Sequence, residues 1–180
     1  MAEGGSATRA ITFRPLAPDD LPTLHRWLSN PRVYRWYGGA APTLAEVAAK
    51  YASRTLAASS VHPFLILHDG VPIGYIQSYT LADAEDYAAL IGASAGAAAL
   101  DPLIGEDDSA LRGLGAASVR AFLDKVLFAA PGTTQCFVDP YPENLIAIRA
   151  YTRAEFRPLR RIDPASPAAP CLPMRIERPH

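Results

Sequence analysis

The stretch Ala98-Ala-Leu-Asp-Pro-Leu-Ile-Gly-Glu-Asp-Asp-Ser-Ala-Leu-Arg-Gly-Leu-Gly115 decides the fold, together with the helical run Ala116 to Phe128 that follows it. Its first part is apolar, carries one carboxylate at Asp101, and predicts a strand. An acidic turn then leads into a loop in which Gly113 and Gly115 permit unusual backbone angles and leave amide groups exposed. Because the N-terminus of a helix carries a partial positive charge, this junction predicts a pyrophosphate site.

The sequence on either side of this stretch predicts strands interspersed with helices. Strands are expected at 10–14, 64–67, 72–79, 98–104, 134–138, 156–162 and 171–177, and helices at about 19–30, 43–56, 116–128 and 144–153. The alanine-rich run 80–97 fits either an irregular loop or a weak helix. This order indicates the α/β fold class, a mixed sheet of about seven strands with about four helices on its faces. We expect a flexible tail at 1–9 and one domain over 10–180.

Composition and charge exclude several classes of function. A net charge of −1 without a lysine or arginine block argues against a nucleic-acid partner. No apolar run approaches the ~20 residues of a membrane helix, so we expect a soluble cytoplasmic protein that does not bind membranes. The two cysteines and four histidines have no disulfide or metal-ligand spacing, so no metal is expected. Monomer and homodimer both stay open.

Local charge is more informative than the net charge. Acidic residues gather at 83–86 and at 106–108, whereas basic residues gather at 149–161. An acidic mouth would suit a cationic ligand. Solvated surface loops are an equally good explanation of either acidic cluster alone.

Several motifs together resemble the GCN5-related N-acetyltransferases (GNAT), over about 11–176. The glycine loop of that family has the pattern Arg/Gln-x-x-Gly-x-Gly/Ala, and here it stands as Ala110-Leu-Arg-Gly-Leu-Gly115. The resemblance is greatest to the aminoglycoside 6'-N-acetyltransferases. It rests on segments in matching order: Trp36-Tyr-Gly-Gly39, Pro72-Ile-Gly-Tyr-Ile-Gln-Ser-Tyr79, Leu100-Asp-Pro-Leu-Ile104, Val138-Asp-Pro-Tyr-Pro-Glu-Asn144 and Ala147-Ile-Arg-Ala-Tyr151.

The resemblance implies an enzyme that uses acetyl-coenzyme A and acetylates a cationic amine by direct attack on the thioester. Asp101 would act as base or position the amine, Tyr151 would protonate the departing thiolate, and Asp139 would contact the aminoglycoside. From the residues themselves, Asp101 can equally be a strand-edge carboxylate that makes a turn, and Tyr151 can equally be a core tyrosine. A tyrosine with an ordinary pKa near ~10 is protonated at neutral pH and can donate to sulfur.

Two further groups of residues are candidates for binding. The cofactor candidates lie on the strand, the glycine loop and the next helix: Leu103, Ile104, Arg112, Gly113, Leu114, Gly115, Ala116 and Asn144. Backbone amides after Pro102 would polarise the thioester carbonyl, while Asn144 can equally be a helix cap. The acceptor candidates are aromatic, amide and acidic side chains, which suit sugar rings and ammonium groups: Tyr37, Tyr51, Gln77, Tyr79, Asp86, Asp101 and Asp139.

Departures from the family pattern keep other functions open. The segment Ala88 to Ala99 replaces a tryptophan- and glutamate-rich stretch, and Glu155 replaces a glycine favoured at a helix end. A related enzyme acting on a siderophore lysine or hydroxylysine, a polyamine or a peptide is one alternative. Such siderophore enzymes typically carry histidine at the position of Asp101, which favours the aminoglycoside group. A protein that binds its ligand without catalysis is the other alternative.

Overall fold

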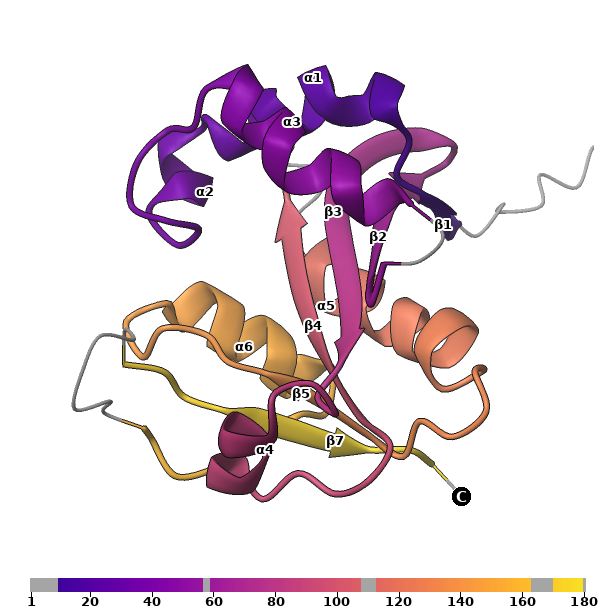
Figure 1. Cartoon of the computed structure of the whole chain (residues 1–180), viewed down its shortest axis with the longest axis vertical. Coiled ribbons are helices and arrows are strands. Elements are labelled where there is room, and N and C mark those ends of the chain that lie inside the picture. The colour runs from indigo at the N-terminus through magenta and orange to yellow at the C-terminus, as the bar shows by residue number, and fades with distance from the viewer. Residues whose placement is uncertain (1–9, 57–58, 108–112, 163–169, 180) are drawn as a thin grey trace, which may run out of the picture.

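A seven-stranded mixed sheet in the order β1-β2-β3-β4-β5-β7-β6 forms the centre of the molecule (Figure 1). The computed structural model describes residues 10–56, 59–107, 113–162 and 170–179. The expected tail at 1–9 lies outside these residues. The strands are β1 (Ile11–Pro15), β2 (Val61–His68), β3 (Val71–Thr80), β4 (Ala97–Ile104), β5 (Gln135–Val138), β6 (Arg157–Pro158) and β7 (Met174–Glu177). Only the β4–β5 pair is parallel.

The helices agree with the expected positions and add short elements. The described residues form α1 (Leu21–Leu28), α2 (Pro31–Tyr34), α3 (Leu44–Ala52), α4 (Glu85–Ile91), α5 (Leu114–Phe122) and α6 (Leu145–Arg153). Short helical turns η1 (Pro18–Asp20), η2 (Ser53–Thr55) and η4 (Leu123–Leu127) extend α1, α3 and α5. The alanine-rich run therefore does contain a helix, α4, which ends at Gly92 in the left-handed conformation.

Two local sequence signals are confirmed in detail. At the start of α3, the Glu46 amide donates to the Thr43 hydroxyl at 3.2 Å, and the Thr43 amide donates to the Glu46 carboxylate at 2.7 Å. This reciprocal pair is a capping box, which the sequence pattern of Thr43 with Glu46 three residues later favours. Asp69 and Gly70 both have positive φ between β2 and β3, as a tight hairpin with the right twist requires.

The two faces of the sheet carry different sets of helices. On one face, α1, α2 and α3 pack over β2 and β3 around Trp27, while α4 packs separately beside Phe137. The opposite face is covered by α5, η4 and α6, with Phe122 at the centre of that cluster. Because all three apolar clusters share one sheet, the described residues form a single domain. No described helix has the length and apolarity to cross a membrane.

β4 and β5 pair only at their beginnings and then separate. The parallel register covers Ala97 to Ala99 against Gln135 to Phe137, whereas β3 pairs with β4 as far as Ile104. Figure 1 shows the consequence, because β2, β3 and β4 stand upright in the view while β5 and β7 lie across it below them. On its β5 side, the edge of β4 beyond Ala99 therefore has no partner strand among the described residues.

Three details differ from the sequence-based expectation. The expected strand at 156–162 is reduced to the two residues of β6 and a single bridge between Ile162 and Cys171. The expected helix 116–128 changes from α to π geometry at Leu123. Glu155 has φ 72°, so it occupies the left-handed position where glycine is favoured, and its side chain forms an ion pair with Arg120 of α5.

A glycine contact fixes the top of β4. Gly105 lies against the buried Trp27 ring, and a methyl group at its Cβ position would come within 2.1 Å of that indole. We expect Gly105→Ala to lower the free energy of unfolding by about 1–3 kcal/mol, because the ring must move in a close-packed core. Urea unfolding followed by tryptophan fluorescence measures this change.

The matched control is Gly115→Ala. Its added methyl group would meet only Ile104, at 3.8 Å, so we expect no loss of stability. Equal stability of both variants would contradict the importance of the Gly105–Trp27 contact.

Candidate active site

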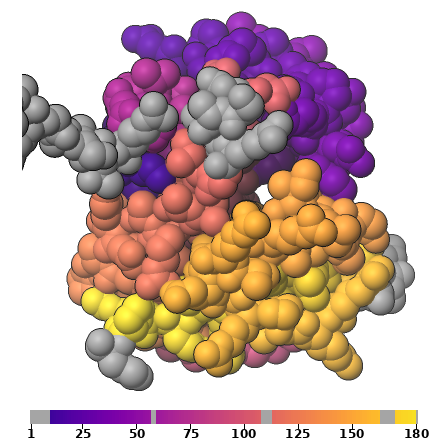
Figure 2. Space-filling model, turned by 180° about the vertical axis from the view of Figure 1, so that it is seen from behind, coloured from indigo at the N-terminus to yellow at the C-terminus, as the bar shows by residue number. Residues whose placement is uncertain are grey.

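A cleft of about 900 Å³ opens where β4 and β5 separate. Its walls come from the α2–α3 segment and β4 on one side and from the loop after β5 and α6 on the other. Figure 2 shows a hollow between the purple N-terminal part and the orange segment that contains α6. The cleft therefore joins the two faces of the sheet through the gap between its strands.

Asp101 lies at the centre of this cleft on β4. It is opposite Gln77 of β3, whose Nε2 donates to Asp101 Oδ2 at 2.5 Å. Tyr75 and Leu103 join the cluster around Trp27, whereas Ala99 joins the α4 cluster, so Asp101 occupies a polar notch between two apolar clusters. Burial raises the pKa of Asp101 to about 6, and the Gln77 hydrogen bond opposes that rise.

Asp139 is a second carboxylate of the cleft, directly after β5. It accepts a hydrogen bond of 3.2 Å from the hydroxyl of Tyr87 on α4. Desolvation by the cleft walls raises its pKa above the ordinary value, and the Tyr87 bond opposes this. The two carboxylates are close enough for the charge of Asp139 to raise the pKa of Asp101 as well.

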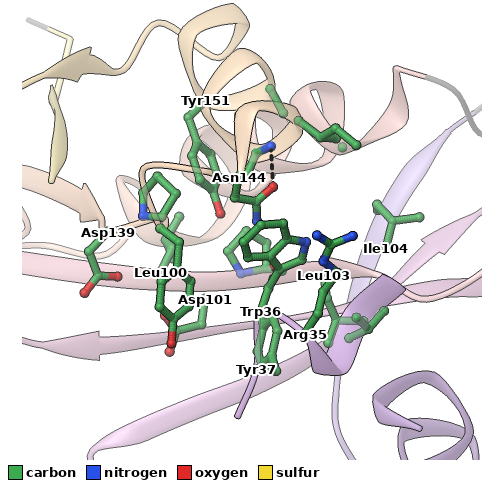
Figure 3. Close-up of a pocket in the computed structure, with 18 of the residues that line it drawn as sticks. Arg35, Trp36, Tyr37, Leu100, Asp101, Leu103, Ile104, Asp139, Asn144 and Tyr151 are labelled. Carbon is green, nitrogen blue, oxygen red and sulfur yellow. Dashed lines mark hydrogen bonds between the residues drawn. The ribbon is translucent and has the colours of Figure 1, made fainter. Parts of the chain in front are cut away.

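Tyr151 reaches the same cleft from α6, on the opposite face of the sheet. Its ring is buried against Phe156, with a centroid distance of 5.9 Å. Figure 3 shows the side chain pointing into the cleft from the side opposite Tyr37. Burial first, and then the charges of Asp101 and Asp139, raise the pKa of Tyr151 well above 10, so the phenol keeps its proton.

Aromatic and basic side chains line the remaining wall. Trp36 lies 5.9 Å from the Tyr141 ring across the cleft, and the Tyr37 hydroxyl donates to the Pro102 carbonyl at 2.9 Å. The buried Tyr51 ring has two cations over it, Arg54 at 4.9 Å and Lys50 at 5.6 Å. The cleft thus combines aromatic faces with charges of both signs.

A carboxylate and a protonated phenol lie at the separation of two strands, near a glycine-bearing turn into a helix, and the comparisons identify the family. The sequence model of the acetyltransferase (GNAT) domain matches residues 17–164. The chain belongs to the GNAT acetyltransferase family. An aminoglycoside N(6')-acetyltransferase type 1 of Klebsiella pneumoniae is 37% identical over 149 residues, which is 82% of this chain and 74% of that protein.

Solved structures agree with this GNAT assignment. AAC(6')-Ib in complex with paromomycin and acetyl-coenzyme A superposes with a TM-score of 0.78 and 33% identity, covering 94% of each chain. AAC(6')-Ib in complex with ribostamycin and coenzyme A gives the same TM-score, identity and coverage. The expected family and fold are thereby confirmed, and the chain is an acetyltransferase.

The open edge of β4 suits the thioester and its pantetheine arm in a GNAT enzyme. The Gly105 amide donates to Ile73, and antiparallel partners alternate, so the Leu103 amide also faces β3. Leu100, Pro102 and Ile104 face the other edge. Because Pro102 has no N–H, the Ile104 amide is the donor beyond it that faces the cleft.

The glycine-bearing turn completes the expected cofactor side. Gly113 has φ 89° and is the N-cap of α5. Because glycine has no side chain to cap the helix, the first amides of α5 point outward from its N-terminus without a side-chain partner among the described residues. Gly115 lines the cleft. Arg112, which we expected to contribute charge there, lies outside the described residues.

The structure brings most of the expected site residues to the cleft. Those that line it are Tyr37, Tyr51, Gln77, Asp101, Leu103, Ile104, Gly115, Asp139, Asn144 and Tyr151. Leu114 and Ala116 begin α5 beside it. Asn144 caps α6, since its Oδ1 accepts from the Ala147 amide at 3.2 Å (Figure 3).

Two acceptor candidates lie outside the lining of the cleft. Tyr79 is half-buried, and burial first, then the charge of Asp101, raises the pKa of its phenol. Asp86 is exposed on α4. Its helical neighbour Tyr87 is the α4 residue that reaches the cleft instead.

The sequence did not predict four residues of the cleft, two of them basic and two of them tyrosines. Lys50, Arg54, Tyr87 and Tyr141 line the cleft, and each comes from an element distant from Asp101 in the sequence. For Arg54 the spacing carried a usable signal, since it lies three residues after Tyr51 and so next to it on the helical surface, whereas the position of Lys50 directly before Tyr51 carried none. Tyr87 and Tyr141 carried no comparable signal.

The raised pKa of Asp101 predicts a gain of stability from Asp101→Asn. A carboxyl whose pKa is higher in the folded protein destabilises the fold when ionised, and this penalty disappears as the pH falls through about 6. We expect the variant to unfold with a free energy about 1–3 kcal/mol higher at pH 8. Near pH 4 the two proteins should be equally stable, as urea unfolding at both pH values can show.

Proposed function

We propose that this acetyltransferase transfers the acetyl group of acetyl-coenzyme A to the 6'-amine of an aminoglycoside. The observation that carries the proposal is the position of Asp101 and Tyr151, which reach one cleft from opposite faces of the sheet. A proton acceptor and a proton donor on two sides of one cleft are what direct acetyl transfer needs. The aminoglycoside relatives support the choice of acceptor.

Asp101 performs the first task, which is to hold the acceptor and remove its proton. With a pKa of about 6, the carboxylate is ionised at neutral pH and attracts an ammonium group. It takes the proton of that group directly or through water, which leaves the nitrogen lone pair free to attack the thioester carbon. The C–N bond forms as the C–S bond breaks, and the Ile104 amide at the open edge of β4 donates to the carbonyl oxygen. The nitrogen then gives up its second proton, which restores the Tyr151 phenol after that phenol has protonated the sulfur.

Tyr151 performs the second task, which is to supply a proton to the sulfur. Its phenol keeps that proton at all working pH values because its pKa is raised. The charge of Asp101 is one cause of this rise, so the phenol becomes more acidic once Asp101 has taken the proton of the amine. The proton that leaves the amine thus helps to release the proton that the thiolate needs.

The acceptor side supplies carboxylates and aromatic rings. Asp139 and Glu143 line the cleft on the β5–α6 side, and Trp36 and Tyr37 line it on the other. Carboxylates pair with ammonium groups, while aromatic faces pack against sugar rings. Since it uses acetyl-coenzyme A, we expect the enzyme to act in the cytoplasm.

The test is thiol release from acetyl-coenzyme A with neomycin and paromomycin. This matched pair of acceptors differs at the 6' position, where neomycin has an amine and paromomycin has a hydroxyl. We expect turnover with neomycin and none with paromomycin. Equal turnover with both would place the reaction at another amine, and no turnover by folded protein that binds acetyl-coenzyme A would overturn the proposal.

Tyr151→Phe separates proton donation from binding. The variant keeps the ring that packs against Phe156 but has no phenolic proton. We expect kcat to fall by about 100-fold, while the dissociation constant of acetyl-coenzyme A, measured by calorimetry, stays unchanged. A kcat close to that of the wild type would show that water protonates the sulfur.

A second acceptor class is favoured by the basic side chains of the cleft. Lys50 and Arg54 both line it, and within the described part of the chain neither forms an ion pair with a carboxylate. Two cations beside Asp101 oppose an acceptor with many positive charges. An amine with a single positive charge, such as a lysine or hydroxylysine side chain, is therefore the alternative, and the same thiol-release assay distinguishes it.

A further inference from the structure

A hydrogen-bonded chain of three side chains runs from η2 to the proposed base. The Nη1 atom of Arg54 donates to Gln77 Oε1 at 2.5 Å, and the Tyr75 hydroxyl donates to the same oxygen at 2.7 Å. The other end of this amide, Nε2, donates to Asp101 Oδ2 at 2.5 Å. Gln77 is buried, so none of these bonds is easily replaced by water.

The Arg54 guanidinium determines which way the Gln77 amide points. A side-chain amide has an acceptor at one end and a donor group at the other, whereas a guanidinium only donates and a phenol hydroxyl can do both. If the amide turned over, its NH2 group would face the Arg54 donor, and its partially negative oxygen would face the Asp101 carboxylate. The hydrogen bonds to Arg54 and Asp101 would then be lost, and only the Tyr75 hydroxyl could bond the turned amide, as an acceptor.

We propose that Arg54 is a positioning residue of this enzyme: by donating to Gln77 it holds the amide in the orientation that donates to Asp101, and so keeps that carboxylate ionised and facing the acceptor. Arg54 does not contact the reacting atoms in this scheme and acts through Gln77. The inference rests on the proposed role of Asp101 and adds a positioning residue to it.

The surroundings of Arg54 suit a fixed role. The residue lies in η2, directly after α3, and its guanidinium group is held over the Tyr51 ring at 4.9 Å. Tyr51 in turn packs edge-to-face on Tyr75 at 5.6 Å. Both aromatic residues are buried, so the arginine and the second donor to Gln77 share one rigid platform.

The charged groups around Asp101 define what a change at Arg54 should do. Burial and the charge of Asp139 raise the pKa of Asp101, whereas the Gln77 hydrogen bond, Arg54 and Lys50 lower it. Tyr37, Tyr51, Tyr75, Tyr79 and Tyr151 also face it and stay uncharged, since burial raises the pKa of each. Loss of Arg54 therefore removes a positive charge and also releases the amide that stabilises the ionised carboxylate.

Arg54→Met and Lys50→Met form the matched pair that tests this. Both remove one cation from the same Tyr51 ring, but only Arg54 contacts Gln77. We expect Arg54→Met to move the acid limb of the kcat/KM profile to higher pH by about one unit. The value of kcat/KM should then fall about fivefold at pH 6 and change little at pH 8. Lys50→Met should move it less than half as far, and Arg54→Lys should recover most of the shift.

Carboxyl titration by NMR of protein labelled with ¹³C-aspartate measures the same shift without turnover. The Asp101 signal is assigned by its loss in Asp101→Asn. The pKa of Asp101 could rise clearly more in Arg54→Met than in Lys50→Met while the enzyme accepts no amine. That result would support the positioning role while overturning the proposed function. Equal shifts in Arg54→Met and Lys50→Met would reduce Arg54 to one charge among others and overturn the positioning role.

A Gln77→Leu background provides the second test. If Arg54 acts through the amide, adding Arg54→Met to Gln77→Leu should shift the titration no further than Lys50→Met does. An undiminished Arg54→Met effect without Gln77 would contradict the inference. Thermal unfolding of each variant shows that the comparison is made between folded proteins.

Discussion

The separation of β4 from β5 is the constraint on which the site depends. Backbone pairing between these strands ends after Ala99, and prolines stand where it would have to continue. Pro102 turns its nitrogen, which has no hydrogen to donate, toward the β5 side, and Pro140 follows β5 after one residue. Two prolines in facing positions leave an opening in the middle of a sheet, and helices on both faces can then reach one cleft.

This opening explains how residues on opposite faces of the sheet can line one cleft. Asp101 is on the face covered by α1 to α4, whereas Tyr151 belongs to the cluster under α5 and α6. In a continuous sheet the backbone would separate them. Through the opening the charge of Asp101 reaches the Tyr151 phenol, and the two pKa values become linked. The linkage favours a sequence in which the carboxylate is neutralised before the phenol gives up its proton.

The sequence predicted the elements whose signals are local. The capping box at Thr43 and the turn at Asp69-Gly70 need only neighbouring residues to form, and both are present. The order of strands and helices was enough to indicate the fold class. The sequence was less informative at the alanine-rich run, which has high helix propensity but no clear periodicity. It was also less informative at the end of α6, where Glu155 takes the left-handed position of a glycine and the Phe156 amide donates to the Tyr151 carbonyl.

The candidate site was predictable only in part for the same reason. Asp101, Asp139 and Tyr151 came from matching family motifs, and the structure places all three at one cleft. The contact between Arg54 and Gln77 depends on how α3 and η2 pack on β3, and nothing in either local sequence specifies it. Tertiary packing also decides that Tyr87, rather than Asp86, faces Asp139.

The distribution of charge along the cleft bears on which acceptor fits. Lys50 and Arg54 stand on the α3 side of Asp101, and Asp139 and Glu143 stand on the side of α6. A polycation bound at Asp101 is therefore repelled from one wall and attracted to the other, which orients it before reaction. Its remaining ammonium groups must extend toward α6, and an acceptor whose charges surround the reacting amine on all sides would be poorly held. The charges of Arg54 and Lys50 also lower the pKa of Asp101, after the Gln77 hydrogen bond, so the side chains that repel part of a polycation also favour the ionised carboxylate that attracts its amine.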